Sequence, residues 1–239
     1  MSKGRLLATD LLLQGLQAIL FLLFIAFRII TGTATMPEKD IPRPIPAAHI
    51  RLAALGEPQL AAKLVTFWLL TADIQAGRWL RLEQINYPNL TGWLQTIQSL
   101  DPASDYPGMI ASGVFIDVKD PQRARWIIEF VEENFRQLPD RRWRWLVHCT
   151  VYAKYRLHDL PLALKLAASL RAYTSPEVLP SWARDMEFIL LQELGEHETA
   201  RQVVQGILRS GEVQEPREQL FLMRRLEELE QAAGIEAVE

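Results

Sequence analysis

The chain has 239 residues, of which 49% are hydrophobic and 23% are charged. This composition is typical of a folded protein, and the length suits one substantial domain or two small ones. A net charge of −3 argues against a general nucleic-acid binder, because such binding depends on neutralising phosphates. The single cysteine, Cys149, excludes an internal disulfide and a cysteine-based metal site, and it leaves the redox compartment open.

A short N-terminal tail, residues 1–10, precedes an apolar stretch over residues 11–30 that carries no charge from Leu11 to Phe27. About 20 helical residues at ~1.5 Å each match the roughly 30 Å hydrocarbon core of a bilayer. We therefore predict a transmembrane helix over 11–30 that anchors the chain by a single pass in the inner (cytoplasmic) membrane. Two alternatives stay open: a cleaved signal peptide, with a cleavage site at Gly32–Ala34, and a buried core helix.

Basic residues flank the apolar stretch on both sides, so their count does not fix the orientation. A short tail followed by a long domain is the usual arrangement of a bacterial signal anchor, which predicts a periplasmic domain. Four prolines between Pro37 and Pro46 favour extended polyproline-like backbone, so residues 31–46 are predicted to be a semi-rigid linker that is not packed.

From residue 47 onward the chain is predicted to be all-α, because Pro or Gly punctuates a succession of amphipathic stretches. Three segments share one pattern, in which an aromatic residue is followed 14 residues later by an acid and four residues after that by alanine. These triplets are Tyr106, Asp120 and Ala124; Trp145, Asp159 and Ala163; and Trp182, Glu196 and Ala200. The apolar or small residues between them recur with helical period and are predicted to face inward, Val114 in the first segment and Ile189 in the third among them. Each segment is therefore predicted to be two helices joined by a turn at the acidic residue.

This pattern resembles the tetratricopeptide repeat, and the second segment shows the likeness in Trp145, Tyr152, Asp159, Ala163 and Pro176. The copies are longer than that family's unit of about 34 residues. The resemblance implies a solenoid of stacked helix pairs that binds peptides or proteins. It divides the chain into N-terminal helices of the solenoid at 47–99, repeats at 100–211, and a capping helix with tail at 212–239. The capping helix is predicted to turn Leu220, Met223, Leu226 and Leu229 inward. The stretch Leu100–Pro107 also resembles a signature of membrane-anchored bacterial proteins.

Catalytic chemistry finds little support in the sequence. No two histidines have metal-ligand spacing on one predicted face, and the acidic series is explained as turn residues. Cys149 falls in a core position of the repeat, and its neighbour His148 points elsewhere on the helix. We predict no enzyme activity, no cofactor, no metal and no small-molecule substrate. A pocket that gathered His148 or His158 with carboxylates would indicate an enzyme.

Two tryptophans, Trp126 and Trp143, occupy positions that are polar or irregular in the other repeats, and arginines surround Trp143. Tryptophan and arginine are enriched at the energetic hot spots of interfaces. The candidate partner-binding residues are Trp126, Arg136, Arg141, Arg142, Trp143 and Arg144. The alternative is that Trp143 packs on the preceding helix pair and that the arginines reflect composition alone.

The function predicted from these observations is a membrane-anchored helical-repeat scaffold or adaptor. It would bind a partner protein and support the assembly of a cell-envelope complex. One alternative is an RNA-binding helical-repeat protein, which the acidic charge disfavours, so no nucleic acid is expected. A further alternative is an enzyme with an unrecognised site.

Overall fold

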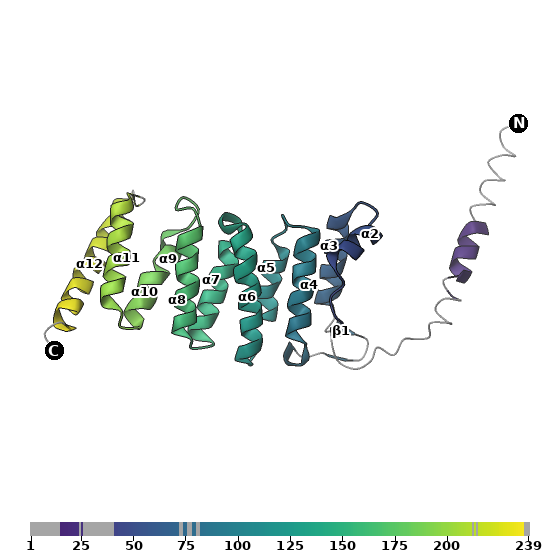
Figure 1. Cartoon of the computed structure of the whole chain (residues 1–239), viewed down its shortest axis with the longest axis horizontal. Coiled ribbons are helices and arrows are strands. Elements are labelled where there is room, and N and C mark those ends of the chain that lie inside the picture. The colour runs from purple at the N-terminus through teal and green to yellow at the C-terminus, as the bar shows by residue number, and fades with distance from the viewer. Residues whose placement is uncertain are drawn as a thin grey trace, which may run out of the picture. The chain divides into compact units, whose positions relative to one another are not determined.

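The computed structural model describes residues 15–23, 25, 41–71, 74–75, 78–79, 82–211, 213 and 215–236. The chain divides into two units, Met1–Lys39 and Asp40–Glu239 (Figure 1). In the first unit residues 15–23 and 25 are helical, and the rest of the predicted anchor at 11–30 lies outside the described residues, as do the tail at 1–10 and the possible cleavage site at 32–34. No helix in the described ranges combines the length and the apolar character that crossing a membrane requires.

The second unit confirms the all-α prediction, since its described part is helical apart from one antiparallel pair of two-residue strands. Its elements are α2 (Ala47–Ala53), α3 (Pro58–Leu70), β1 (Ile74–Gln75), β2 (Arg78–Trp79), the 3₁₀ turn η1 (Leu82–Gln84), α4 (Tyr87–Leu100), α5 (Tyr106–Ile110), the π-helical turn η2 (Ala111–Phe115), α6 (Pro121–Gln137), α7 (Pro139–Tyr155), α8 (Leu160–Tyr173), α9 (Ser181–Arg184), α10 (Met186–Glu193), α11 (His197–Ser210) and α12 (Pro216–Glu236).

The helices of this unit form a row in which each long helix packs against the next along the chain. Figure 1 shows α4, α6 and α8 nearer the viewer and α5 and α7 behind them. Contacts also join alternate helices, α4 with α6 and α5 with α7. We call α3, α5, α7 and α9–α10 the first helices of successive pairs, and α4, α6, α8 and α11 the second helices.

The acidic residues of the repeated pattern lie at helix starts, as predicted. The Asp120 carboxylate accepts a hydrogen bond from the backbone N–H of Gln122 at 2.9 Å. Asp159 accepts one from the backbone N–H of Leu162 at 3.0 Å. Glu196 precedes α11 without a side-chain cap of this kind. Asp120 and Asp159 therefore satisfy N–H groups that the first turn of a helix leaves free, which is a structural role.

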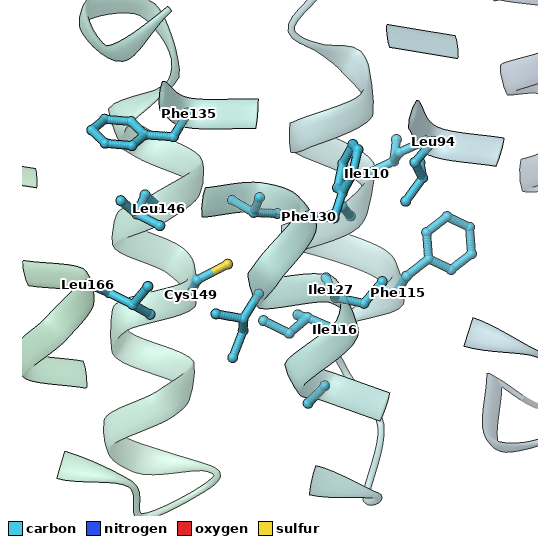
Figure 2. Close-up of a cluster of buried hydrophobic side chains, with 14 of the residues drawn as sticks. Leu94, Ile110, Phe115, Ile116, Ile127, Phe130, Phe135, Leu146, Cys149 and Leu166 are labelled. Atoms are coloured by element: carbon cyan, nitrogen blue, oxygen red, sulfur yellow. The ribbon is translucent and has the colours of Figure 1, made fainter. Parts of the chain in front are cut away.

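The second helices carry the core that the repeat predicts. Ala124, Ala163 and Ala200 are all fully buried, and their small side chains allow the paired helices to approach closely. Ile127 of α6 and Cys149 of α7 belong to one buried cluster, which Figure 2 shows between these helices. A second cluster at the C-terminal end joins α10, α11 and α12.

The first helices depart from the predicted apolar positions in two places. In η2 the backbone makes a π-turn, and Val114 is exposed while Phe115 is buried. A π-turn contains an extra residue and so rotates the following side chains around the axis. In the third pair the helix is interrupted at Asp185, and Phe188 is buried where Ile189 was expected. The predicted inward positions of Val114 and Ile189 are therefore wrong.

Residues 41–46, which the sequence analysis assigns to an unpacked linker, instead lie along α4. The side chain of Ile41 is buried. Its carbonyl oxygen accepts a hydrogen bond from Asn89 Nδ2 at 2.8 Å, and that of Pro42 accepts one from Trp93 Nε1 at 2.8 Å. An extended polyproline-like backbone forms no regular internal hydrogen bonds, so the carbonyls of Ile41 and Pro42 can accept hydrogen bonds from side chains of α4.

The C-terminal helix α12 packs with a face that matches the prediction only in part, since Leu229 is buried and Leu226 packs against the second cluster as expected. Leu222 and Leu229 are buried against the second cluster. Leu220 and Met223, which were expected to point inward, are exposed. The run of four apolar residues at 220–223 offers two possible inward faces, and the packing against α11 selects the one that contains Leu222.

Candidate functional site

The first helices carry two surface grooves. Groove 1 has a volume of about 680 Å³ and groove 2 of about 500 Å³. The walls of groove 1 include Lys63, Phe67 and Leu70 of α3, Tyr106 and Met109 of α5, and Arg141 of α7. Groove 2 is lined by Trp143, Arg144, Trp145, Val147, His148 and Val151 of α7 and by Trp182 of α9. We call the surface that carries both grooves the first-helix face.

Groove 1 is mainly apolar because α3 and α5 leave large side chains outside the core. Phe67 and Tyr106 are both exposed, and Met109 is partly exposed beside them. Burying such surface against a partner is favourable at about 25 cal/mol per Å². An exposed apolar patch on a helix whose opposite side is already packed in the core marks a site of interaction with another molecule.

One end of groove 1 is charged. Arg141 Nη2 donates a hydrogen bond to Asp105 Oδ2 at 2.9 Å, and Arg141 is 54% exposed. An ion pair in contact with solvent contributes little to stability, in the range of about 0–1 kcal/mol. Both partners can therefore exchange this contact for one with a bound ligand at small cost.

Groove 2 is built from tryptophans. Trp182 is 55% exposed, and its ring meets the buried ring of Trp143 edge to face, with centroids 6.0 Å apart. The Arg144 guanidinium lies over the Trp143 ring, 4.8 Å from its centroid. No carboxylate pairs with Arg144 in the part of the chain that the structure describes. His148 lies beside Trp145, with centroids 6.3 Å apart.

Arg142, the residue before Trp143, has a different environment. Its side chain is 0% exposed. It donates hydrogen bonds to the carbonyl oxygens of Asn134 at 2.9 Å, Pro102 at 2.5 Å and Ser104 at 3.1 Å. Burial lowers the pKa of Arg142, and the nearby Asp105 carboxylate opposes that shift. Arg142 therefore joins the loop before α5 to the last turn of α6, where the helix dipole favours a cation.

The structure does not gather the six predicted interface residues at one place. Arg141 and Arg144 border the grooves and Trp143 forms the floor of groove 2. Arg142 is interior, so we leave it out of the surface proposed below. The other two lie on α6 outside both grooves: Trp126 is 38% exposed, and Arg136 pairs with Glu132 at 2.7 Å and covers the Tyr173 ring.

Sequence reasoning missed two exposed aromatic residues of this face. Tyr106 and Trp182 occupy the same position of the repeat as Trp145, which suggested that their rings pack against neighbouring helices. In the structure Trp145 is half-buried, whereas Tyr106 and Trp182 face solvent. All three helices start at or beside a proline, at Pro107, Pro139 and Pro180, so the prolines do not distinguish the two exposed rings from Trp145.

The described residues bring together interface chemistry rather than reactive groups. No cluster of three or more His, Cys, Asp or Glu side chains that could hold a metal ion occurs among them. Groove 2 includes His148 without any carboxylate in its wall. Cys149 is fully buried, and this burial raises the pKa of its thiol far above the usual range. What the face does expose is aromatic rings and a guanidinium, the groups enriched at protein-binding hot spots.

Comparison of the chain with protein-family models, curated proteins and solved structures gives no match.

Proposed function

We propose that the protein is a membrane-anchored, tetratricopeptide-like solenoid that binds a partner protein along the first-helix face. The observation that carries this proposal is the pair of grooves on neighbouring first helices, one apolar and one lined by three tryptophans. A solenoid of helix pairs presents an extended surface suited to a peptide or a helix of another protein. The function follows from this site and not from the architecture alone.

The charge of the grooves favours a protein over a nucleic acid. Lys63, Arg141 and Arg144 line them together with the carboxylates Asp101 and Asp105. The two acids would repel the phosphates of an RNA backbone. A polypeptide that combines apolar side chains with a carboxylate would bury its apolar groups in the grooves and pair with Arg144.

Membrane anchoring rests on the sequence of residues 11–30, with its uncharged run from Leu11 to Phe27. In the proposed arrangement this segment crosses the inner membrane once, and the helical unit lies on the periplasmic side. A tethered scaffold in that position would help to assemble a cell-envelope complex.

Two exposed tryptophans allow a matched test of the proposed face. Trp182 lines groove 2, whereas Trp126 lies on α6 outside both grooves. The tagged full chain and its Trp182→Ala and Trp126→Ala variants are purified from membranes in mild detergent, and the co-purifying proteins are quantified. Loss of a hot-spot side chain costs about 2 kcal/mol or more, so Trp182→Ala should weaken the affinity for the partner about 30-fold and reduce its recovery.

In the same experiment Trp126→Ala should retain the partner at the level of the wild-type chain. Arg144→Glu, which reverses the charge at groove 2, should behave like Trp182→Ala. Equal recovery with all the variants would show that the first-helix face does not bind the partner. Arg142 and Trp143 are unsuitable for this test, because substitution of a buried side chain would damage packing as well.

A further inference from the structure

The first two helices of the second unit leave a row of leucines in contact with solvent. Leu52 of α2 and Leu55 in the turn that follows are exposed, the latter by 93%. Leu60 and Leu64 of α3 are also exposed, Leu64 by 61%, and their spacing of four residues places them on one side of the helix. We call Leu52, Leu55, Leu60 and Leu64 the leucine face.

This surface is unusual at the end of a row of helices. Terminal helices of a repeat array normally turn a polar side outward, because no further repeat covers them. Here α3 contains one charged residue, Lys63, among thirteen. Exposed leucines gathered on one helical hairpin are the kind of apolar surface that marks contact with another apolar body.

Charge points to the nature of that body. Neither α2 nor α3 contains an acidic residue, whereas they carry Arg51 and Lys63. The one acid of this hairpin, Glu57, lies in the connecting turn. Arg51 donates a hydrogen bond to the Ser99 carbonyl oxygen of α4 and Lys63 lines groove 1. A chain of net charge −3 thus presents at this end helices without acids and with basic residues beside the leucines. Leucines flanked by lysine or arginine, without acids, are typical of helices that lie in the interface of an anionic bilayer.

The connection to the proposed anchor limits how far this surface can be from the membrane. Residues 41–46 are packed on α4, so only residues 31–40 separate the segment 11–30 from the docked chain. Ten residues span at most about 35 Å when fully extended. The docked segment lies on α4, and α4 in turn packs against both α2 and α3. If 11–30 crosses a bilayer, the α2–α3 hairpin therefore stays close to its surface.

We propose that the leucine face lies in the interfacial layer of the bilayer. This inference rests on the proposed membrane anchor. It adds a second contact with the membrane, which fixes the end of the row of helices at the lipid surface instead of leaving it on a free tether.

Fluorescence in reconstituted vesicles tests the proposal on the full chain. The native Cys149 is buried, so a thiol-reactive NBD dye should not label the wild-type protein, and this is the first control. The variants Leu64→Cys in the leucine face, Arg209→Cys on the exposed side of α11, and Leu20→Cys in the proposed anchor each add one accessible thiol. The labelled proteins are placed in vesicles of phosphatidylcholine and phosphatidylglycerol with nitroxide-bearing lipids.

The dye at position 64 should show blue-shifted emission and should be quenched by a nitroxide near the headgroup. The dye at position 209 should emit as in water and should not be quenched. Water-like emission at 64 overturns the proposal, whatever the dye at 20 reports. A third result would also overturn the proposal. The emission at 64 would be blue-shifted without quenching by the nitroxide lipids, and the blue shift would disappear when each vesicle holds a single chain. The leucine face would then contact a second copy of the chain.

The dye at position 20 separates this inference from the proposed function. Quenching there by a nitroxide deep in the acyl chains supports the anchor. Quenching at 64 without quenching at 20 would leave the leucine face as a lipid contact and would contradict the transmembrane anchor.

Discussion

The buried guanidinium of Arg142 provides the sharpest test of how this chain is packed. Its acceptors are the carbonyl oxygens of Pro102, Ser104 and Asn134 and, at 3.4 Å, Gln137 Oε1, and none of its surface reaches solvent. Arg142→Met keeps most of the side-chain volume and removes every donor. The three carbonyls would then lie in the interior with fewer or no partners.

The magnitude follows from the hydrogen bonds that are lost. Bonds to a charged group contribute about 1.5–3 kcal/mol each. Part of this lost stability is regained because the variant no longer buries a cation. Removing one partner of a buried charge interaction costs about 3–5 kcal/mol in general. We expect Arg142→Met to lower the free energy of unfolding by about 3–5 kcal/mol, a large share of the 5–15 kcal/mol typical of a folded protein.

The assay is urea unfolding of the full chain in mild detergent, followed by tryptophan fluorescence. The midpoint for Arg142→Met should fall by roughly 1–2 M. Arg144→Met is the matched control, since Arg144 is exposed and stacks on Trp143, a contact of about 0.5–1 kcal/mol. Equal midpoints for the two variants would refute the structural role given to Arg142.

Three further predictions concern other parts of the fold. A Cβ added at Gly92 would lie 2.6 Å from Pro44 Cγ, whereas one at Gly206 meets nothing within 4 Å. Gly92→Ala should therefore lower the free energy of unfolding by about 1–3 kcal/mol, and Gly206→Ala should raise it by about 0.5–1 kcal/mol. The reverse order of the two variants in urea unfolding would contradict the docking of residues 41–46. Native Cys149 should not react with a thiol reagent and should react fully in denaturant, because burial keeps it protonated; rapid native labelling would count against this. Burial raises the pKa of Asp185 from 3.8 to about 6, so between these pH values the folded chain binds more protons than the unfolded chain. The contribution of Asp185 to stability should therefore fall as pH rises through that range. Asp185→Asn should flatten the pH dependence of Tm, and an unchanged dependence would exclude this carboxyl as its source.

The features that sequence reasoning predicted well are local ones. Asp120 and Asp159 act on N–H groups two or three residues away, and Ala124 and Ala163 lie within the first turn of the helix that follows. Such short-range relations repeat in the sequence because each helix pair needs them. They identified the helix pairs and most of the core of the second helices.

The features that sequence reasoning did not predict depend on distant partners. The sequence indicates a surface position for Arg142. Its side chain is buried because it donates hydrogen bonds to the carbonyls of Pro102 and Ser104, which lie 40 and 38 positions earlier in the chain. The docking of residues 41–46 depends on α4, about 50 residues later in the chain. The exposure of Trp182 follows from where the short helix α9 meets α8 and α10. None of these relations leaves a periodic trace in the sequence.

The central claim, that a protein partner binds along the first-helix face, is tested most directly by photocrosslinking in cells. The photoreactive residue p-benzoylphenylalanine is placed at Tyr106, at Trp182 or at Trp126, all of which are exposed. We predict that the first two positions yield an adduct with the same partner protein and that Trp126 does not. No adduct from Tyr106 and Trp182, or an equal yield of that adduct from Trp126, would contradict the proposed face.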